Sequence, residues 1–198
     1  MKLETPQETP ASDAGGQQAE AKSTAQNPMP AAEALARRLL ELRARDACLS
    51  HEAMALPEST SRLTALTKAR AENGQALKAI VQQGGWPSRE AVGDEASTAA
   101  LQVLLHAEDR ELQLTCRDLI LASVQEGDSL AIHGAYIEDF CCVLEGRKQR
   151  YGTKFDPALL RPYPIEDPDD VDERRRAVGL PPLEDQLQQL RGAAQHRT

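Results

Sequence analysis

The sequence predicts an all-α fold, an orthogonal or up-down bundle of about five main helices with a C-terminal helical arm. Three observations favour it. Apolar residues recur at helical spacing over long stretches, and Ser, Asp, Pro and Gly stand where these stretches begin or end. No stretch alternates apolar and polar residues over the length of a strand. We divide the chain into a disordered N-terminal tail (1–30), a helical bundle (31–146), and an irregular segment plus a C-terminal helical arm that packs on the bundle (147–198).

The tail is defined by its composition. Residues 1–30 are rich in Ala, Gln, Ser, Thr and Pro and carry almost no large apolar side chains. Such a segment buries too little apolar surface to offset the entropy lost on ordering. We therefore expect proteases to remove it and leave a stable core.

The first two helices come directly after the tail. The first begins at Pro30 or the next residue, because proline suits a first turn, and covers about 31–54. The second covers about 58–83 and ends at Gly84-Gly85. A turn at Trp86-Pro87-Ser88 and a short segment to residue 93 follow.

Three more helices complete the bundle. Asp94 is the predicted N-cap of a helix that runs to about residue 108, and Asp109 caps the next, which runs to 126. Gly127-Asp128 end it, and a fifth helix runs from about Ser129 to Gly146. The inward-facing residues predicted for this fifth helix are Ile132, Tyr136, Phe140 and Val143.

The C-terminal third has a different character. Residues 147–167 contain three prolines and form a long irregular segment, a feature that is often functional. A short helix is predicted over 168–178, where acidic residues precede Arg174-Arg175-Arg176 in what we interpret as a solvated helix start. A last helix begins at Pro181 or Pro182 and reaches about residue 191.

Charge and hydropathy exclude several function classes. The net charge is -8, and no basic patch with interleaved aromatic residues occurs, so we expect no nucleic-acid binding. No segment approaches the ~20 apolar residues of a membrane span, and the N-terminus lacks the apolar core of a signal peptide. We expect a cytoplasmic protein without a membrane partner. Its four cysteines, including Cys48, are expected to be buried thiols rather than a disulfide framework.

Polar residues stand where helical spacing predicts core residues. Asp46 continues a stripe of leucines in the first helix, and Arg70 and Asn73 interrupt the stripe of the second. His106 lies inside an almost wholly apolar run over 99–107. Because a buried polar group is costly without a partner, we expect these residues to converge in one pocket.

The pocket has two interpretations. In the first, His106 acts as an acid, base or ligand and Asp46 orients its ring, while Arg70, Asn73 and Trp86 contribute to ligand binding. In the second, the residues form a satisfied buried network that fixes the helix register, with Asp46 and Arg70 as an ion pair, and Trp86 only fills one end of the bundle. The sequence does not decide between them.

Two further residues are candidates in the irregular segment. Tyr151 and Thr153 bring hydroxyl groups, and we expect their segment to pack across the bundle and close one side of the pocket. No Glu-x-x-His or His-Glu-x-x-His pair occurs, so no metal site is predicted. No nucleophile or phosphate-binding motif is present either, and any cofactor is unknown.

An ordered set of short motifs resembles an uncharacterised bacterial family. The motifs are Gly85-Trp86-Pro87, Val92-Gly93, His106-Ala107-Glu108, Glu145-Gly146, Gln149-x-Tyr151-Gly152-Thr153 and Val171-Asp172-x-Arg174-Arg175-x-x-Val178-Gly179-Leu180-x-Pro182-Leu183. Over about residues 35–190 they are similar to a domain of unknown function that is common in actinobacteria. The resemblance implies no established activity, but it implies that Asp46, Asn73, Trp86 and His106 are positions of the family pattern.

The chain departs from that pattern at four positions. Ala47, Leu105 and Lys154 each stand where the family usually has Gln, and Phe140 stands where it usually has Arg. The loss of these polar groups would leave a shared polar site with fewer hydrogen-bonding groups, so this chain either binds differently or has lost an activity that its relatives keep.

Two functions follow from the sequence. The first is a cytosolic helical domain whose polar pocket at Asp46, Asn73, Trp86 and His106 binds a small molecule or a peptide, with an enzymatic role left open. The alternative is a non-catalytic protein-interaction or structural protein whose buried polar residues only fix the fold. In that case the tail and the proline-rich arm would contact a protein partner.

Overall fold

Helices make up almost all of the regular structure, which confirms the all-α prediction. The computed structural model describes residues 30–195, so the tail predicted over 1–30 lies, apart from Pro30, outside the described residues. Within the described part, no helix is both long enough and apolar enough to cross a membrane. The elements in chain order are α1 (Ala31–Ala55), α2 (Thr60–Gly84), α3 (Arg89–Val92), α4 (Asp94–His106), α5 (Arg110–Glu126), α6 (Ala131–Leu144), β1 (Phe155–Asp156), β2 (Arg161–Pro162), the 3-10 turn η1 (Pro168–Asp170), α7 (Val171–Ala177) and α8 (Leu183–Gln195).

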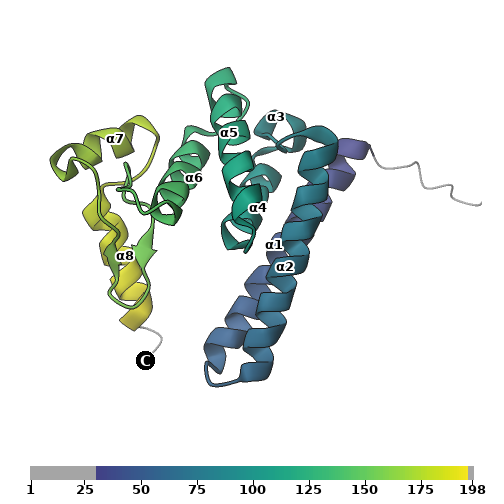
Figure 1. Cartoon of the computed structure of the whole chain (residues 1–198), viewed down its shortest axis with the longest axis horizontal. Coiled ribbons are helices and arrows are strands. Elements are labelled where there is room, and N and C mark those ends of the chain that lie inside the picture. The colour runs from purple at the N-terminus through teal and green to yellow at the C-terminus, as the bar shows by residue number, and fades with distance from the viewer. Residues whose placement is uncertain (1–29, 196–198) are drawn as a thin grey trace, which may run out of the picture.

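α4 is the central helix of the bundle. It packs against α1, α2 and α3 on one side and against α5 and α6 on the other. In Figure 1, α1 and α2 form a long antiparallel hairpin on one flank, and α7 and α8 lie on the opposite flank. Small residues allow this close packing, since Ala99 and Ala100 on α4 are fully buried. Side chains at the two edges of α4 can therefore reach α1 on one side and α6 on the other.

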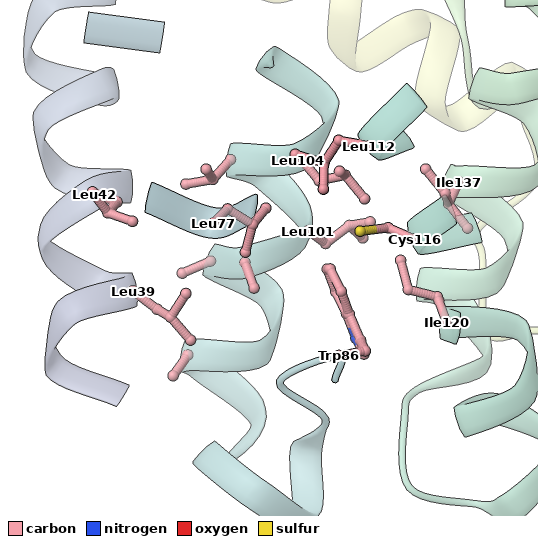
Figure 2. Close-up of a cluster of buried hydrophobic side chains, with 14 of the residues drawn as sticks. Leu39, Leu42, Leu77, Trp86, Leu101, Leu104, Leu112, Cys116, Ile120 and Ile137 are labelled. Carbon is pink, nitrogen blue, oxygen red and sulfur yellow. The ribbon is translucent and has the colours of Figure 1, made fainter. Parts of the chain in front are cut away.

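The core gathers around α4. Trp86, which follows α2, points its ring into this core beside α4 and α5 and is buried (Figure 2). A buried aromatic ring contributes mainly through the apolar area that it removes from water. The other buried residues labelled in the core are Leu39, Leu42, Leu77, Leu101, Leu104, Leu112, Cys116, Ile120 and Ile137.

Most helix ends follow the predicted signals, with one exception. The Asp109 carboxylate caps α5 as predicted and accepts a hydrogen bond from the Leu112 amide at 2.9 Å. The predicted N-cap Asp94 is wrong, because Asp94 is already helical and Gly93 is the cap residue. Gly93 ends α3 and precedes α4 at a φ of 84°, a conformation that glycine adopts readily.

The buried face of α6 differs from the prediction. Phe140 is buried as expected, but Ile132, Tyr136 and Val143 are only half-buried. Both His133 and Asp139 are buried instead. α6 has the α4–α5 layer on one side and residues of the C-terminal third on the other, so more than one of its faces is covered. Apolar spacing alone could not identify both faces.

Candidate functional site

Asp46, Arg70 and His106 meet at one point between α1, α2 and α4. The Asp46 carboxylate accepts hydrogen bonds from His106 Nδ1 at 2.8 Å and from Arg70 Nε at 2.9 Å, through different oxygens. Ser50, one turn after Asp46, donates to the same carboxylate at 3.4 Å and accepts from Arg70 Nη2 at 3.2 Å. We call these four residues the Asp46 cluster. The predicted convergence is confirmed for Asp46, Arg70 and His106.

The end of α4 places His106 at this point. His106 is the last residue of α4, and the next residue, Ala107, has extended backbone angles. The Gln113 side-chain amide donates to the carbonyls of Leu104 and Ala107 and so closes the helix end. Gly74 of α2 lets that helix approach, because a Cβ there would lie 3.1 Å from the Ala107 Cβ. Arg70 lies one turn before Gly74 and thus faces Asp46.

Asp46 is ionised because its partners outweigh its burial. Burial alone would raise the pKa of this carboxyl, which is only 9 % exposed. The hydrogen bond from Arg70, the positive charges of His106 and Arg70, and the hydrogen bond from His106 together lower the pKa below its ordinary 3.8. At neutral pH the cluster therefore contains a carboxylate, and its oxygens can only accept hydrogen bonds.

The Asp46 carboxylate fixes the tautomer of His106. Since the carboxylate oxygen must accept, Nδ1 of the ring carries the proton and donates it. In a neutral ring this leaves the lone pair on Nε2, for which no hydrogen-bond partner is found among residues 30–195. The His106 side chain is 45 % exposed, whereas Asp46 is almost fully buried behind it. The arrangement is a histidine with one nitrogen held and the other free to bind or to exchange a proton.

A cavity lies next to this ring, between α1 and α4. Its volume is about 360 Å³, which is within the range of small-molecule sites. Arg43 on its wall is paired with Glu95 at 2.7 Å. The residues that line this α1–α4 cavity are Arg43, Asp46, Ala47, Ser50, Met54, Gln102, Val103 and His106.

Arg70, Asn73 and Trp86 do not line the α1–α4 cavity, so the prediction of one pocket is wrong for these three residues, although Arg70 contacts Asp46. Asn73 is buried beside the cluster, and its Nδ2 donates to the Leu42 carbonyl of α1 at 3.0 Å. It joins α1 to α2 and leaves its own Oδ1 without a partner. Trp86 belongs to the core. Helical spacing identified the inward face correctly, but the core and the cavity are both on that face.

Tyr151 and Thr153 belong to a different structure. The buried carboxylate of Asp139 on α6 accepts from the backbone amides of Arg150, Tyr151 and Thr153 and from the Thr153 hydroxyl, at 2.7 to 3.2 Å. The irregular segment is thus tied to α6 and contributes no residue to the α1–α4 cavity. The expectation that it closes the pocket is wrong.

Sequence reasoning missed two buried polar groups that organise the C-terminal third. Arg175 is fully buried, although we interpreted its triple-arginine run as solvated. It donates to the carbonyls of Tyr151 and Pro181 and to the Gln186 side chain. The fully buried Gln149 side chain donates to the carbonyls of Lys154 and Tyr163. No helical periodicity could reveal these contacts, because most of the partners lie in irregular segments and Gln186 lies on a separate helix, α8.

Three of the four thiols are buried. Cys116, Cys141 and Cys142 are buried, and burial raises the pKa of Cys116 to about 12 and that of Cys141 to about 11. Cys48 is exposed, which corrects the expectation that all four thiols are buried. In the described part of the chain, no three His, Cys, Asp or Glu side chains are grouped as ligands for a metal ion.

A family model described as "Family of unknown function (DUF6624)" matches residues 47–197. The chain belongs to this family. The DUF6624 match confirms the resemblance to a domain of unknown function, and it includes Arg70 and His106 while starting one residue after Asp46. Comparisons with curated proteins and with solved structures found no match to the chain.

The structure places the four residues that we expected to depart from the family pattern. Ala47 lines the α1–α4 cavity, and Leu105 lines a second cavity between α4 and α6. Phe140 and Lys154 contact one another, with the Lys154 ammonium 4.3 Å from the centre of the Phe140 ring. This is a cation–π geometry, so Phe140 of α6 and Lys154 form a pair. Burial lowers the pKa of Lys154.

Proposed function

We propose that the α1–α4 cavity binds a small polar molecule and that His106 exchanges a proton with it. One observation carries the proposal: the ring donates to the buried Asp46 through Nδ1, while its other edge is half-exposed beside the cavity. A histidine that served only the fold would have no need to present a free nitrogen at a cavity wall.

Each member of the cluster has a role in this proposal. His106 Nε2 takes a proton from the bound molecule or from water as a general base, and returns it as a general acid. Asp46 holds the ring in the required tautomer and stabilises the imidazolium that forms. Arg70 keeps Asp46 ionised through the hydrogen bond at 2.9 Å. Without Arg70, the carboxyl would titrate at higher pH and hold the ring less firmly.

The cavity wall suggests the chemistry of the occupant. Arg43 and Gln102 offer hydrogen-bond donors around it, and Val103 offers an apolar surface. Carbonyl, carboxylate and other acceptor groups suit such a wall. We therefore favour a small acceptor-rich molecule over an apolar one, and a peptide could present the same groups.

The alternative is that the cluster is only structural, in a protein that acts through protein contacts. Its support is that the Asp46 cluster joins α1, α2 and α4 and thereby fixes their register. The two proposals differ in one respect. A structural role needs Asp46 and Arg70 paired, whereas a chemical role also needs the free edge of His106.

An activated ester separates the two roles. p-Nitrophenyl acetate reports general-base or nucleophilic imidazole chemistry through release of p-nitrophenol. The variants are His106→Gln and Asp46→Asn, and the control is His51→Gln, which removes an exposed histidine of α1. We expect saturable hydrolysis by the unaltered chain, a loss of about tenfold or more in His106→Gln, a smaller loss in Asp46→Asn, and no change in His51→Gln.

Two other results would count against the chemical role or for the structural alternative. If His106→Gln hydrolyses the ester at the rate of the unaltered chain, the chemical role is wrong. If His106→Gln and Asp46→Asn also unfold at lower urea concentration, the structural alternative gains support.

A further inference from the structure

A second cavity lies on the other side of α4, where this helix faces α6. We call it the α4–α6 cavity. Its volume is about 470 Å³, larger than that of the α1–α4 cavity. Its wall is mostly aliphatic and is formed in large part by Leu101, Leu105, Leu130 and Ile132, with the ring of Tyr136 at its edge. Gln102 borders both cavities, so they flank the same exposed edge of α4.

Besides Gln102, the polar part of this wall is a pair of side chains, one from α4 and one from α6. His133 of α6 is 2 % exposed, and its Nε2 lies 3.1 Å from the Thr98 hydroxyl of α4. Burial lowers the pKa of His133, although the negative charge of Asp94 opposes this. The ring is therefore neutral at physiological pH, with one nitrogen as donor and the other as acceptor.

The second nitrogen of His133 has no partner. Its Nδ1 is one of four buried side-chain polar atoms without a hydrogen bond in the described part of the chain. The other three belong to Asn73, Trp86 and Ser97, none of which lines either cavity. A buried polar atom without a partner is costly, so an unpartnered nitrogen on a residue that lines an aliphatic cavity calls for an explanation.

We propose that the α4–α6 cavity binds a small, neutral and mostly apolar molecule that carries one hydrogen-bonding group. The apolar body contacts the leucine wall and stacks beside Tyr136. The polar group hydrogen-bonds to the Thr98 hydroxyl, the half-buried member of the Thr98–His133 pair. A charged group does not suit the site, because the pair is neutral and the surrounding wall cannot solvate a charge. The site is separate from His106 and does not depend on the function proposed for it.

Phenol and benzene test this proposal on the full chain, because they share a ring and differ by one hydroxyl. Binding is followed by backbone and side-chain amide shifts in NMR titrations. We expect phenol to shift the amides around Thr98, Gln102 and His133 in a saturable way. We expect benzene to bind about three- to tenfold more weakly, which corresponds to the ~0.5–1.5 kcal/mol of one hydrogen bond. Benzoate, the charged probe, should not bind.

Three variants locate the site. Leu105→Trp fills the cavity from its half-buried wall and should abolish phenol binding, whereas Leu63→Trp, at a leucine of α2 that is 47 % exposed, should leave it unchanged. Thr98→Val keeps the side-chain volume and removes the hydroxyl, so it should reduce the difference in affinity between phenol and benzene. His106→Gln should leave phenol binding intact, which distinguishes this site from the α1–α4 cavity.

Several results would overturn the proposal. Equal affinity for phenol and benzene would show that the Thr98–His133 pair contributes no hydrogen bond to binding. Unchanged phenol binding by Leu105→Trp would place the probe elsewhere. An absence of saturable shifts would mean that the cavity does not take such molecules.

Discussion

Replacing Asp139 with asparagine perturbs the attachment of the irregular segment to α6. In the unaltered chain, Oδ1 accepts from the Arg150 amide at 2.7 Å and from the Tyr151 amide at 3.1 Å. Oδ2 accepts from the Thr153 amide at 2.8 Å and from its hydroxyl at 2.9 Å. The Asn amide has one oxygen and one NH2 group, so the NH2 group faces a backbone donor in either orientation: the Arg150 amide or the Thr153 amide loses its acceptor. The Tyr151 amide contacts both oxygens and keeps one of them, and the Thr153 hydroxyl can turn to accept.

The magnitude follows from these contacts. A hydrogen bond to a charged group contributes about 1.5–3 kcal/mol and a neutral one about 0.5–1.5 kcal/mol, so the loss of one bond and the weakening of the others predict a destabilisation of about 3 kcal/mol or more. Asp139 is fully buried, and water cannot replace the lost acceptors without opening the segment. Domains of this size unfold with about 5–15 kcal/mol, so the variant should lose a large part of its stability.

Urea denaturation of the full chain, followed by circular dichroism, measures the effect. Glu138→Gln is the matched control, because the neighbouring carboxylate is partly exposed and pairs with Arg150 Nη1 at 3.3 Å. Such a pair contributes about 1 kcal/mol or less. Hydrogen exchange at the Tyr151 and Thr153 amides should accelerate in Asp139→Asn only. A destabilisation within about 1 kcal/mol of that in Glu138→Gln would refute the reasoning.

Three further predictions concern pH and packing. Because its partners lower the pKa of Asp46 below 3.8, the ionised carboxylate stabilises the fold above that value, and this contribution is lost as the pH falls through the lower folded-state pKa. In acid denaturation, the stability of Asp46→Asn should therefore depend less on pH below about 4 than that of the unaltered chain. Parallel curves for the two chains would contradict this. Burial lowers the pKa of His133, so the unfolded chain binds the extra proton first and stability should fall as the pH drops below the ordinary 6.5. His133→Gln should reduce that slope in urea titrations between pH 5 and 7, and an unchanged slope would count against it. Gly74→Val should destabilise the fold by about 1–3 kcal/mol in thermal denaturation, since even a Cβ there would lie 3.1 Å from that of Ala107. Gly84→Val, where nothing lies within 4 Å, is the control, and equal effects of the two would contradict the packing argument.

The helices were predictable because their signals are local. The glycines after α2 and α5 and the Asp109 cap each act within a few residues of the helix end that they define. The same local periodicity placed Asp46 and His106 on inward faces, and their partnership followed from the cost of burying polar groups. This part of the site could be predicted from the sequence.

The rest could not be predicted, because it depends on contacts between distant segments. Periodicity shows which face of a helix points inward but not how deeply each residue is buried. Asn73 and Trp86 were therefore assigned to a pocket although they are packed in the core. Asp139 and Arg175 are polar residues whose hydrogen-bond partners lie outside their own helices, 6 to 24 positions away. His133 was missed because α6 is covered on more than one face.

The central claim is that Asp46 holds Nδ1 of His106 and leaves Nε2 free at the α1–α4 cavity. Long-range ¹H–¹⁵N correlation spectra of the histidine rings test it most directly, on the full chain at a pH where the rings are neutral. The account predicts that His106 carries its proton on Nδ1 with an unprotonated Nε2, and that Asp46→Asn changes this tautomer while the exposed His51 ring stays the same. A His106 ring protonated on Nε2, or one averaged between tautomers as in free imidazole, would contradict the account.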